Sequence, residues 1–523
     1  MKTIFKKKLI HFIKVVFALI IVAIGIIITA YLWPTSKLQT PVVFEKTIIK
    51  NVNIVDAVTG KVVKNQFVLI ENSRITKIDT THITASDDAL LIDGTGKFLI
   101  PGLWDMHTHS NQHSEWLHHP LYIANGITGV RDMSGQLNKK DSYWVGSKER
   151  LQWNKDLINN KRVTPRYVLQ SSYQMDGEKA IPEDLPSFFK LKNPSQVDSL
   201  LHFYKKEKVD FIKVYQQLSK ETYKALAEKA PKYGLHLAGH KPMFLSLEEA
   251  VNLGQKSFEH GRVFLYEFFP EADSLKNPTN WKAYFSKSKA KIVQQFDSVQ
   301  AKNLMQLMQQ KNAYWTPTLQ TLKFEANAHK ENFTNNENLK YVTSVRKKLW
   351  WKFDTDHNKE KNLESEGVSV SEQFFEASKK QVAMANKMGV PIMAGTDVTD
   401  SYVFAGFSLH NELYELTRSG LSNLEALQSA TIVPAKYSNQ ISDYGTIEIG
   451  KKADLILLNK NPLENIQNSE SIDGILLNGV YYNKEKLTEL KAFTETAASS
   501  FHMNVKTLIS LVNSPLIRVQ FTD

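Results

Sequence analysis

Short apolar runs alternate with longer, more polar stretches through the middle of the chain. Between residues 98 and 443 there are eight apolar runs of strand length, separated by segments long enough for helices. In order they read FLIPGLWDMHTH, IANGITGVRDM, PRYVLQSSY, VDFIKVY, YGLHLAGH, QKSFEHG, NAYWTPTL and GVPIMAGTD. Eight strands that each lead into a helix are typical of a (β/α)8 barrel. We therefore expect an α/β fold with a TIM barrel at residues 98–443.

A second pattern flanks this region on both sides. Residues 43–97 and 444–484 alternate apolar with polar positions, and turn residues such as Asp93 and Gly94 separate the runs. Alternation with a period of two is typical of strands that bury one face. We expect the two segments to meet in one small β-sandwich beside the barrel. Residues 485–523 have a helical composition, and we expect a C-terminal helix that packs on the barrel rather than along a membrane.

The N-terminus carries a long uncharged segment. Residues 15–33 form a run of 19 residues without charge, which as a helix would span about 28 Å, enough for a bilayer core. Five lysines precede it, and Tyr31 and Trp33 stand at its far end, where aromatic rings prefer the membrane interface. This pattern predicts a basic cytoplasmic segment at 1–14, a transmembrane helix at 15–33 and a linker at 34–42.

A cleavable signal peptide is the alternative, although the sequence around Thr29 and Tyr31 is a poor match to a cleavage site. In either case the remainder of the chain would be exported. An uncleaved anchor would make it a single-pass protein of the plasma (inner) membrane with its body on the extracytoplasmic side. Cleavage would release it as a secreted protein.

Composition excludes several classes of protein. The 523 residues include no cysteine, which excludes disulfide frameworks, thiolate nucleophiles and iron–sulfur clusters. The formal charge is +11, but residues 1–40 carry six lysines and no acid, so only +5 remains for the other 483 residues. A groove for nucleic acid needs a concentrated basic face. We therefore expect no nucleic-acid partner.

Five side chains able to bind metal stand at or near the ends of predicted strands: His107, His109, His240, His260 and Asp397. His107 and His109 lie two positions apart, so both project to the same side of their strand. The carboxyl ends of barrel strands converge on one mouth, where catalytic groups sit. One such histidine alone would be read as structural, but the five together predict a metal site. His236, four residues before His240, is a possible ligand on the same strand.

Lys213 is an unusual residue for a buried strand, because it stands between Ile212 and Val214 in VDFIKVY. At an edge, a lysine could extend its ammonium group to solvent. A barrel strand, however, has only an interior and a helix-covered exterior. An inward-facing lysine is desolvated, so its pKa falls. The neutral amine can then take up CO2 and become a carbamate, an anion able to bridge two divalent metals.

Two long connections, residues 263–312 and 320–388, carry aromatic side chains that include Trp281 and Trp350. We expect these connections either at the mouth of the barrel, as substrate walls, or on the surface as helices.

The ordered motifs resemble the amidohydrolase superfamily, within the branch of imidazolonepropionase-like proteins and Xaa-Pro dipeptidases. The resemblance covers about residues 43–484 and rests on PGLWDMHTH, NGITGVRDM, TPRYVLQSS, VDFIKVY, LAGHKP, SFEHG, AGTD, SLHNELYELTRSGLSNLEALQSAT and GTIEIGKKADLILL. It implies a (β/α)8 barrel, a flanking β-sandwich and hydrolysis at one or two metals.

The resemblance also implies a role for each candidate ligand. His107, His109 and Asp397 would bind the more buried of two divalent metal ions, with zinc as the expected metal. His240 and His260 would bind the second ion, and the LAGHKP motif selects the later of the two histidines on that strand.

Lys213, as a carbamate, would bridge the two ions, and Asp397 would pass a proton from water to the departing amine. Tyr215, on the same face as Lys213, would contact the substrate or belong to the core. These roles predict a metal-dependent hydrolase that cleaves C–N amide bonds in a dipeptide, an N-acyl amino acid or a cyclic amide. A mononuclear deaminase is an alternative, disfavoured because Met243 stands where a deaminase has glutamate. A catalytically inactive, anchored binding protein is another alternative. The sequence does not decide whether the protein forms a homo-oligomer.

Overall fold

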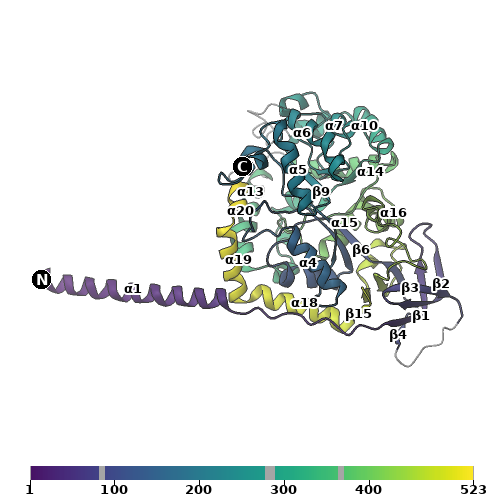
Figure 1. The fold of residues 1–523 in the computed structure, drawn as a ribbon, viewed down its shortest axis with the longest axis horizontal. Helices are drawn as coiled ribbons and strands as arrows, with labels where there is room; N and C mark the ends of the chain where they lie inside the picture. Colours follow the sequence, from purple (N-terminus) through teal and green to yellow (C-terminus); the bar gives the residue numbers. More distant parts are fainter. Residues whose placement is uncertain (1, 82–88, 277–288, 363–369, 522–523) are drawn as a thin grey trace.

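The computed structural model describes residues 2–81, 89–276, 289–362 and 370–521. Trp281 lies outside these residues. At the centre is a barrel of parallel strands surrounded by helices, as the sequence predicts (Figure 1). One ladder contains β6 (Leu103–Thr108), β7 (Ile127–Asp132) and β8 (Arg166–Gln170). The other contains β9 (Phe211–Val214), β10 (His236–Gly239), β11 (Ser257–Glu259) and β12 (Tyr314–Thr316).

Isolated bridges join the two ladders. They are Ser171–Phe211 and Met175–Val214 between β8 and β9, then Trp315–Ile392 and Thr108–Val398. Residues 391–398 therefore lie where the eighth predicted strand belongs, but their backbone is too irregular for a continuous ladder. Gly395 shows how tightly this segment packs, because a Cβ there would lie 2.5 Å from Thr316 and 2.9 Å from the backbone nitrogen of His107. Only glycine permits this approach.

The helices around the strands follow the expected alternation. They are α2 (Ser114–Leu117), α3 (His119–Ala124), α4 (Ser147–Ile158), α5 (Val197–Lys206), α6 (Lys220–Lys229), α7 (Leu247–Asn252), α9 (Lys289–Gln295), α10 (Ser298–Gln310), α11 (Leu319–Asn327), α12 (Glu331–Thr334), α13 (Lys352–Asn362), α14 (Val370–Lys387), α15 (Phe407–Arg418), α16 (Asn423–Ser429) and α17 (Ile432–Tyr437).

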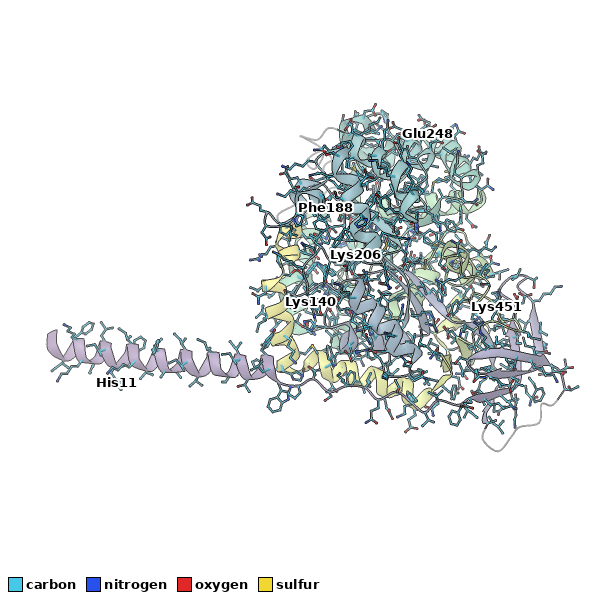
Figure 2. The ribbon with its side chains drawn as sticks, in the orientation of Figure 1. His11, Lys140, Phe188, Lys206, Glu248 and Lys451 are labelled. Atoms are coloured by element: carbon cyan, nitrogen blue, oxygen red, sulfur yellow. The ribbon has the colours of Figure 1, made fainter. Side chains whose placement is uncertain are left out.

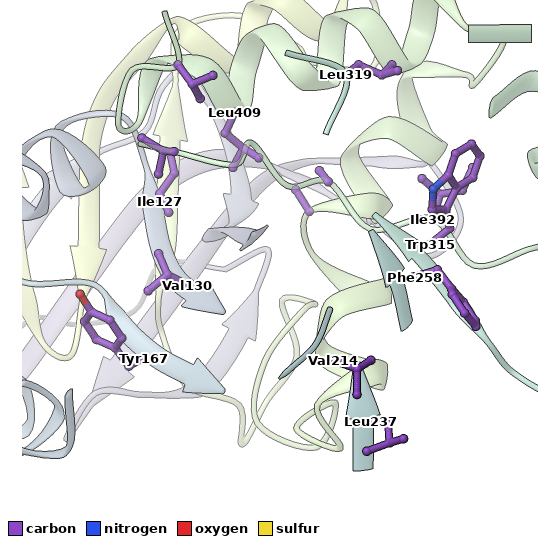
Figure 3. Close-up of a cluster of buried hydrophobic side chains, with 14 of the residues drawn as sticks. Ile127, Val130, Tyr167, Val214, Leu237, Phe258, Trp315, Leu319, Ile392 and Leu409 are labelled. Carbon is purple, nitrogen blue, oxygen red and sulfur yellow. The ribbon is translucent and has the colours of Figure 1, made fainter. Parts of the chain in front are cut away.

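Helix α5 shows why these segments are helical and where they pack. Val197, Leu200, Leu201 and Tyr204 are buried, and their spacing places them on one face of the helix. The strands supply the matching apolar surface. Figure 3 shows Val130, Val214 and Phe258, each from a different barrel strand, in the hydrophobic core that they share with helical residues. This core holds the strands, and hence the side chains at their ends, in place.

The two segments that flank the barrel meet beside it, as predicted, and their strands form one sheet. Its order is β15-β14-β13-β5-β1-β2-β3, with β4 beside β1. The strands are β1 (Lys46–Val55), β2 (Val62–Glu71), β3 (Arg74–Asp79), β4 (Leu90–Asp93), β5 (Phe98–Pro101), β13 (Leu455–Leu458), β14 (Ile472–Leu477) and β15 (Val480–Asn483). β5, which the sequence groups with the barrel, pairs with β1 and β13 instead. The barrel strand begins only after Gly102.

The predicted C-terminal helix is a series of three: α18 (Lys484–Ser499), α19 (Phe501–Asn513) and α20 (Pro515–Phe521). They pack on the body of the protein (Figure 1). Ser500 and Pro515 stand at the breaks, where an N-cap serine and a proline each start a new helix.

Helix α1 (Lys2–Leu32) begins inside the predicted basic segment and projects away from the body. Along most of its length its side chains, His11 among them, extend on all sides, and only its end packs against α19 (Figure 2). Residues Ile4–Leu32 have a mean hydropathy of 2.9 over their most apolar window and are long enough to cross a membrane. Such a helix suits either a signal anchor or a signal peptide. At its base, Lys506 of α19 donates to the carbonyl of Trp33 at 2.6 Å.

Candidate metal centre

The first barrel strand, β6, places two histidines at its carboxyl end. His107 is buried and His109 follows it at the edge of a cavity. The centroids of their rings lie 5.3 Å apart, as expected for side chains on the same face of a strand. Burial lowers the pKa of His109 to about 4, so the ring is neutral and able to act as a ligand.

Asp397 lies at the centre of the histidines. Its Oδ1 atom is 2.9 Å from Nε2 of His109 and 3.3 Å from Nε2 of His107. Its Oδ2 atom is 3.4 Å from Nδ1 of His260. Burial alone would raise the pKa of this carboxyl, but the neighbouring histidines hold it well below its usual range. A backbone φ of +65° turns the side chain into the cavity, a left-handed conformation that is uncommon for residues other than glycine.

His240 follows β10 and His260 follows β11, and their rings meet edge-on with centroids 4.5 Å apart. The two Nε2 atoms are 2.8 Å apart. On its other nitrogen, His260 contacts the hydroxyl of Thr318 at 2.9 Å. Burial lowers the pKa of both rings well below the ordinary value, so both are held neutral. The ring of Tyr215 packs against His240 with centroids 4.1 Å apart.

Lys213 lines the same cavity from β9. Only 2% of the residue is exposed, and its Nζ atom lies 5.7 Å from the centroid of the Tyr215 ring. Burial lowers the pKa of this amine, although the Asp397 carboxylate partly opposes the shift. Lys213 is therefore an inward-facing lysine.

These donors suit a divalent metal ion. Two ligands of a tetrahedral zinc ion, each about 2.0–2.1 Å from it, lie about 3.3 Å from one another. The contacts of Asp397 with His107 and His260, at 3.3 and 3.4 Å, match that separation. Within the described residues, donor atoms of His107, His260 and Asp397 lie within 4.8 Å of one another. This grouping contains His260, whereas the family resemblance pairs His107 and Asp397 with His109.

His236 lies at the other end of β10. Its ring stacks on Phe211, and its Nε2 atom is 3.3 Å from the hydroxyl of Tyr437. It does not line the cavity that contains His240. Asp105, two residues before His107 on β6, does not line the cavity either. Its carboxylate accepts hydrogen bonds from the backbone nitrogen and the hydroxyl of Thr396 at 3.0 and 2.7 Å.

A buried ion pair that the sequence analysis did not identify supports His107. Glu259, fully buried, lies 2.9 Å from Nδ1 of His107 and 2.7 Å from the guanidinium of Arg131. Burial opposes ionisation, but Arg131 and His107 hold the pKa of Glu259 at about 2. The carboxylate thus accepts a hydrogen bond from Nδ1–H of His107, which directs Nε2 of this ring towards a metal. One available signal was the position of Glu259, directly before His260 in a buried strand.

The cavity around these groups has a volume of about 400 Å³. It is lined by the six predicted metal ligands and by Tyr215, the predicted substrate contact. The other lining residues are Trp144, Gln174, Asp176, Gln216, Gln217, Arg262, Trp350, Thr399, Asp400 and Gln520. Trp350 belongs to the long connection at residues 320–388 and lines the cavity, so this connection reaches the mouth of the barrel. Burial raises the pKa of Asp400 well above its ordinary value, and the Asp397 carboxylate adds to this shift. The cavity therefore combines polar groups of both signs with aromatic walls.

Comparisons with known proteins identify a family and a shared fold for this chain. The profile of the amidohydrolase family matches residues 212–481, just over half of the chain. A dihydroorotase of Carboxydothermus hydrogenoformans is 43% identical over 89 residues, which is 16% of this chain and 20% of the dihydroorotase. This chain therefore spans only a fifth of that relative.

Solved structures share the fold over most of its length. A bottromycin amidohydrolase has a TM-score of 0.65 at 21% identity, covering 87% of this chain and 91% of its own. A Xaa-Pro dipeptidase with methionine bound in its active site has a TM-score of 0.57 at 20% identity, covering 84% and 100%. With its (β/α)8 barrel and the family profile over more than half of its length, this chain belongs to the amidohydrolase family of hydrolases.

Proposed function

We propose that this protein is a metal-dependent hydrolase that cleaves C–N amide bonds in small molecules: dipeptides, N-acyl amino acids or cyclic amides. The observation that carries this proposal is the convergence of imidazole nitrogens and the Asp397 carboxylate, at 2.8 to 3.4 Å, in one cavity. Neutral imidazoles around an ionised carboxylate are the ligands that zinc prefers. A volume of about 400 Å³ suits a substrate the size of a dipeptide.

Two divalent metal ions, zinc by the nature of the donors, would be held by five side chains and a modified lysine. We propose His107, His109 and Asp397 as ligands of the more buried ion, and His240 and His260 as ligands of the other. When bound, such ions lower the pKa of a water molecule and polarise a substrate carbonyl. Glu259 holds the ring of His107 in the orientation that binding requires.

Lys213 would bridge the two ions as a carbamate. Its neutral amine forms an N–C bond to CO2 and loses one proton, which gives a carboxylate-like anion. Support for this step comes from the burial of the amine and from its lowered pKa. The resulting negative charge would lie close to three neutral histidines, where it is stabilised only when metal is present.

Asp397 is proposed as the proton carrier. Its pKa is low, so it is ionised at neutral pH and able to accept a proton from water on the way to the departing amine. Tyr215 is proposed to contact the substrate. Burial raises the pKa of its phenol, which therefore keeps its proton and can donate a hydrogen bond to a substrate oxygen.

We further propose that α1 is an uncleaved anchor that keeps the barrel on the extracytoplasmic side of the inner membrane. The apolar surface of α1 supports this placement, because almost all of it is exposed and only the end of the helix near Ala30 packs against another element, α19.

The test is a combined metal analysis and amide screen on full-length protein in detergent. About two zinc ions per chain, together with cleavage of at least one dipeptide, N-acyl amino acid or cyclic amide, would support the proposal. One ion with release of ammonia from an aminated ring would instead identify a deaminase. No metal and no turnover would identify an inactive scaffold.

A further inference from the structure

The C-terminal helix α20 reaches the candidate active site. It lies beyond residue 481, where the match to the amidohydrolase family profile ends. Gln520 of this helix lines the same cavity as His109 and Asp397. A side chain from the last turn of α20 therefore lines a site that is otherwise built from barrel strands and their loops.

One buried carboxylate attaches this helix to a barrel loop. The hydroxyl of Ser514, fully buried before α20, lies 2.8 and 2.9 Å from the two carboxylate oxygens of Asp141. Asp141 also accepts hydrogen bonds from the backbone nitrogens of Tyr143 and Trp144, both at 2.8 Å. Because one side chain orders both segments, the position of α20 depends on the loop that carries Trp144.

Trp144 connects Gln520 to the metal centre. Its indole nitrogen donates to the side-chain oxygen of Gln520 at 3.2 Å, and its ring centroid lies 6.0 Å from that of His109. Gln520 also makes a side-chain hydrogen bond with Tyr173. An amide side chain has two N–H donors and two acceptor sites, so these two contacts still leave Gln520 with further hydrogen-bonding capacity.

Further contacts make α20 a fixed wall rather than a lid. Leu516 and Ile517 are buried beneath the helix. In the preceding helix, the carbonyl of Ser510 accepts a hydrogen bond from Ser142 at 2.8 Å, and its hydroxyl lies 2.7 Å from Nε2 of His113. Opening this side of the cavity would expose apolar surface and leave buried polar groups unpaired, which is costly.

We propose that α20 closes one side of the substrate entrance and that Gln520 is a specificity-determining residue. It would contact the end of the substrate that points away from the metals, and this proposal rests on the proposed amide hydrolase function. Gln174, Gln216 and Gln217 line the same cavity, so the wall is rich in neutral amides. Such groups pair with peptide-like amides, and the position of α20 would limit the length of the substrate.

The test uses the absence of cysteine from the chain, which makes any introduced thiol unique. Gln520→Cys and, as a control, Val512→Cys would each be modified with a methyl or a benzyl methanethiosulfonate in the zinc-loaded, full-length protein. Val512 lies on α19 and is 63% exposed. The substrates are the best amide from the screen and the same amide lengthened by one glycine.

We expect the methyl adduct at position 520 to lower kcat/KM by about three- to tenfold, the scale of one hydrogen bond, mainly through KM. The benzyl adduct should affect the lengthened substrate more than the short one. Adducts at position 512 should change neither substrate by more than about twofold, since surface changes remote from a site have small effects. Complete labelling at position 520 with unchanged kcat/KM for both substrates would overturn the proposal.

A second measurement separates this proposal from the function on which it rests. If the unmodified protein binds zinc but cleaves no amide, the amide hydrolase function fails. The adducts are then compared by the rate at which dipicolinate removes zinc. If only the benzyl adduct at position 520 slows the removal of zinc, the proposal that α20 forms a wall of the cavity is supported. Equal removal rates for all adducts would reject that proposal. A protein that binds no zinc would reject both proposals.

Discussion

The Nε2 atoms of His240 and His260 lie 2.8 Å apart, although the two residues end different strands of the barrel. Two neutral imidazoles approach this closely when the N–H of one ring donates a hydrogen bond to the unprotonated nitrogen of the other. Burial keeps the pKa of both rings well below the ordinary value, so a charged pair is excluded at neutral pH. Both rings are therefore neutral donors of the kind that a divalent metal binds, and each candidate ligand can be tested.

Replacing His107 or His109 with alanine should lower both metal content and activity. Loss of one ligand should weaken binding by more than about 100-fold, beyond the 10- to 100-fold cost of losing a group that only supports a ligand. Metal analysis after dialysis against a weak chelator measures this effect. His236→Ala is the matched control, because His236 contacts Phe211 and Tyr437 outside the cavity. Equal losses of metal and activity in His236→Ala and His240→Ala would contradict the choice of His240 as the ligand on this strand.

Asp397→Asn should separate proton transfer from metal binding. Asparagine keeps the size and one oxygen, so part of the metal should stay bound, but the amide cannot accept the proton from water. We expect turnover to fall by about 100-fold or more, which is the lower part of the range for general acid–base catalysis. This fall in turnover should exceed the loss of metal. Turnover corrected for metal occupancy is the measurement. Near-wild-type turnover would assign proton transfer to another group.

Lys213→Ala should remove the bridge between the two ions. The variant should lose about one zinc ion and nearly all activity while its circular dichroism stays unchanged, since alanine is tolerated in a buried strand. Added formate or acetate should occupy the vacated space and restore part of the turnover. Metal-free wild-type protein should also recover faster with bicarbonate than in CO2-depleted buffer. A carbamate-free ammonium at Lys213 in the zinc-loaded protein would reject the bridge.

His410 should make folding sensitive to acid at a place remote from the metal centre. It is buried between the hydroxyl of Ser469 at 2.8 Å and the carbonyl of Asn125 at 2.9 Å. Burial lowers its pKa from 6.5 to about 4. Between those pH values the unfolded chain binds a proton that the native state does not, so stability should fall as pH falls through this window. The shift corresponds to roughly 3 kcal/mol at most.

The free energy of unfolding, measured with a chelator present from pH 7 to pH 4, checks this expectation. His410→Gln should be less stable at pH 7, because it disturbs buried hydrogen bonds, but its stability should fall less steeply with acid. Parallel curves for the two proteins would show that another group causes the acid sensitivity.

The direction of α1 in the membrane can be tested with a reporter fused after Asp523. We expect a reporter that works only outside the cytoplasm to be active, because the lysines before the apolar segment favour the cytoplasmic side. Mass spectrometry of the mature protein should recover the first residues if α1 is uncleaved. A cytoplasmic signal from the fusion would reject the anchored topology, and loss of α1 would indicate a cleaved signal peptide.

The sequence by itself determined the features that depend on local periodicity. The alternation of strands and helices predicted the barrel, and the spacing of two placed His107 and His109 on one face of a strand. The apolar neighbours of Lys213 predicted its burial for the same reason. Each of these properties follows from the geometry of a single segment.

Only the tertiary structure decided which side chains meet across segments. Arg131 and Glu259 are 128 positions apart, and nothing local predicts their contact. The grouping of His260 with His107 and Asp397 depends on how the strands are staggered, and on left-handed backbone conformations of +74° at His260 and +65° at Asp397. Gln520 reaches the cavity because Ser514 meets Asp141. Such contacts depend on the packing of the whole chain, because strand pairing and helix docking set distances that no single segment encodes.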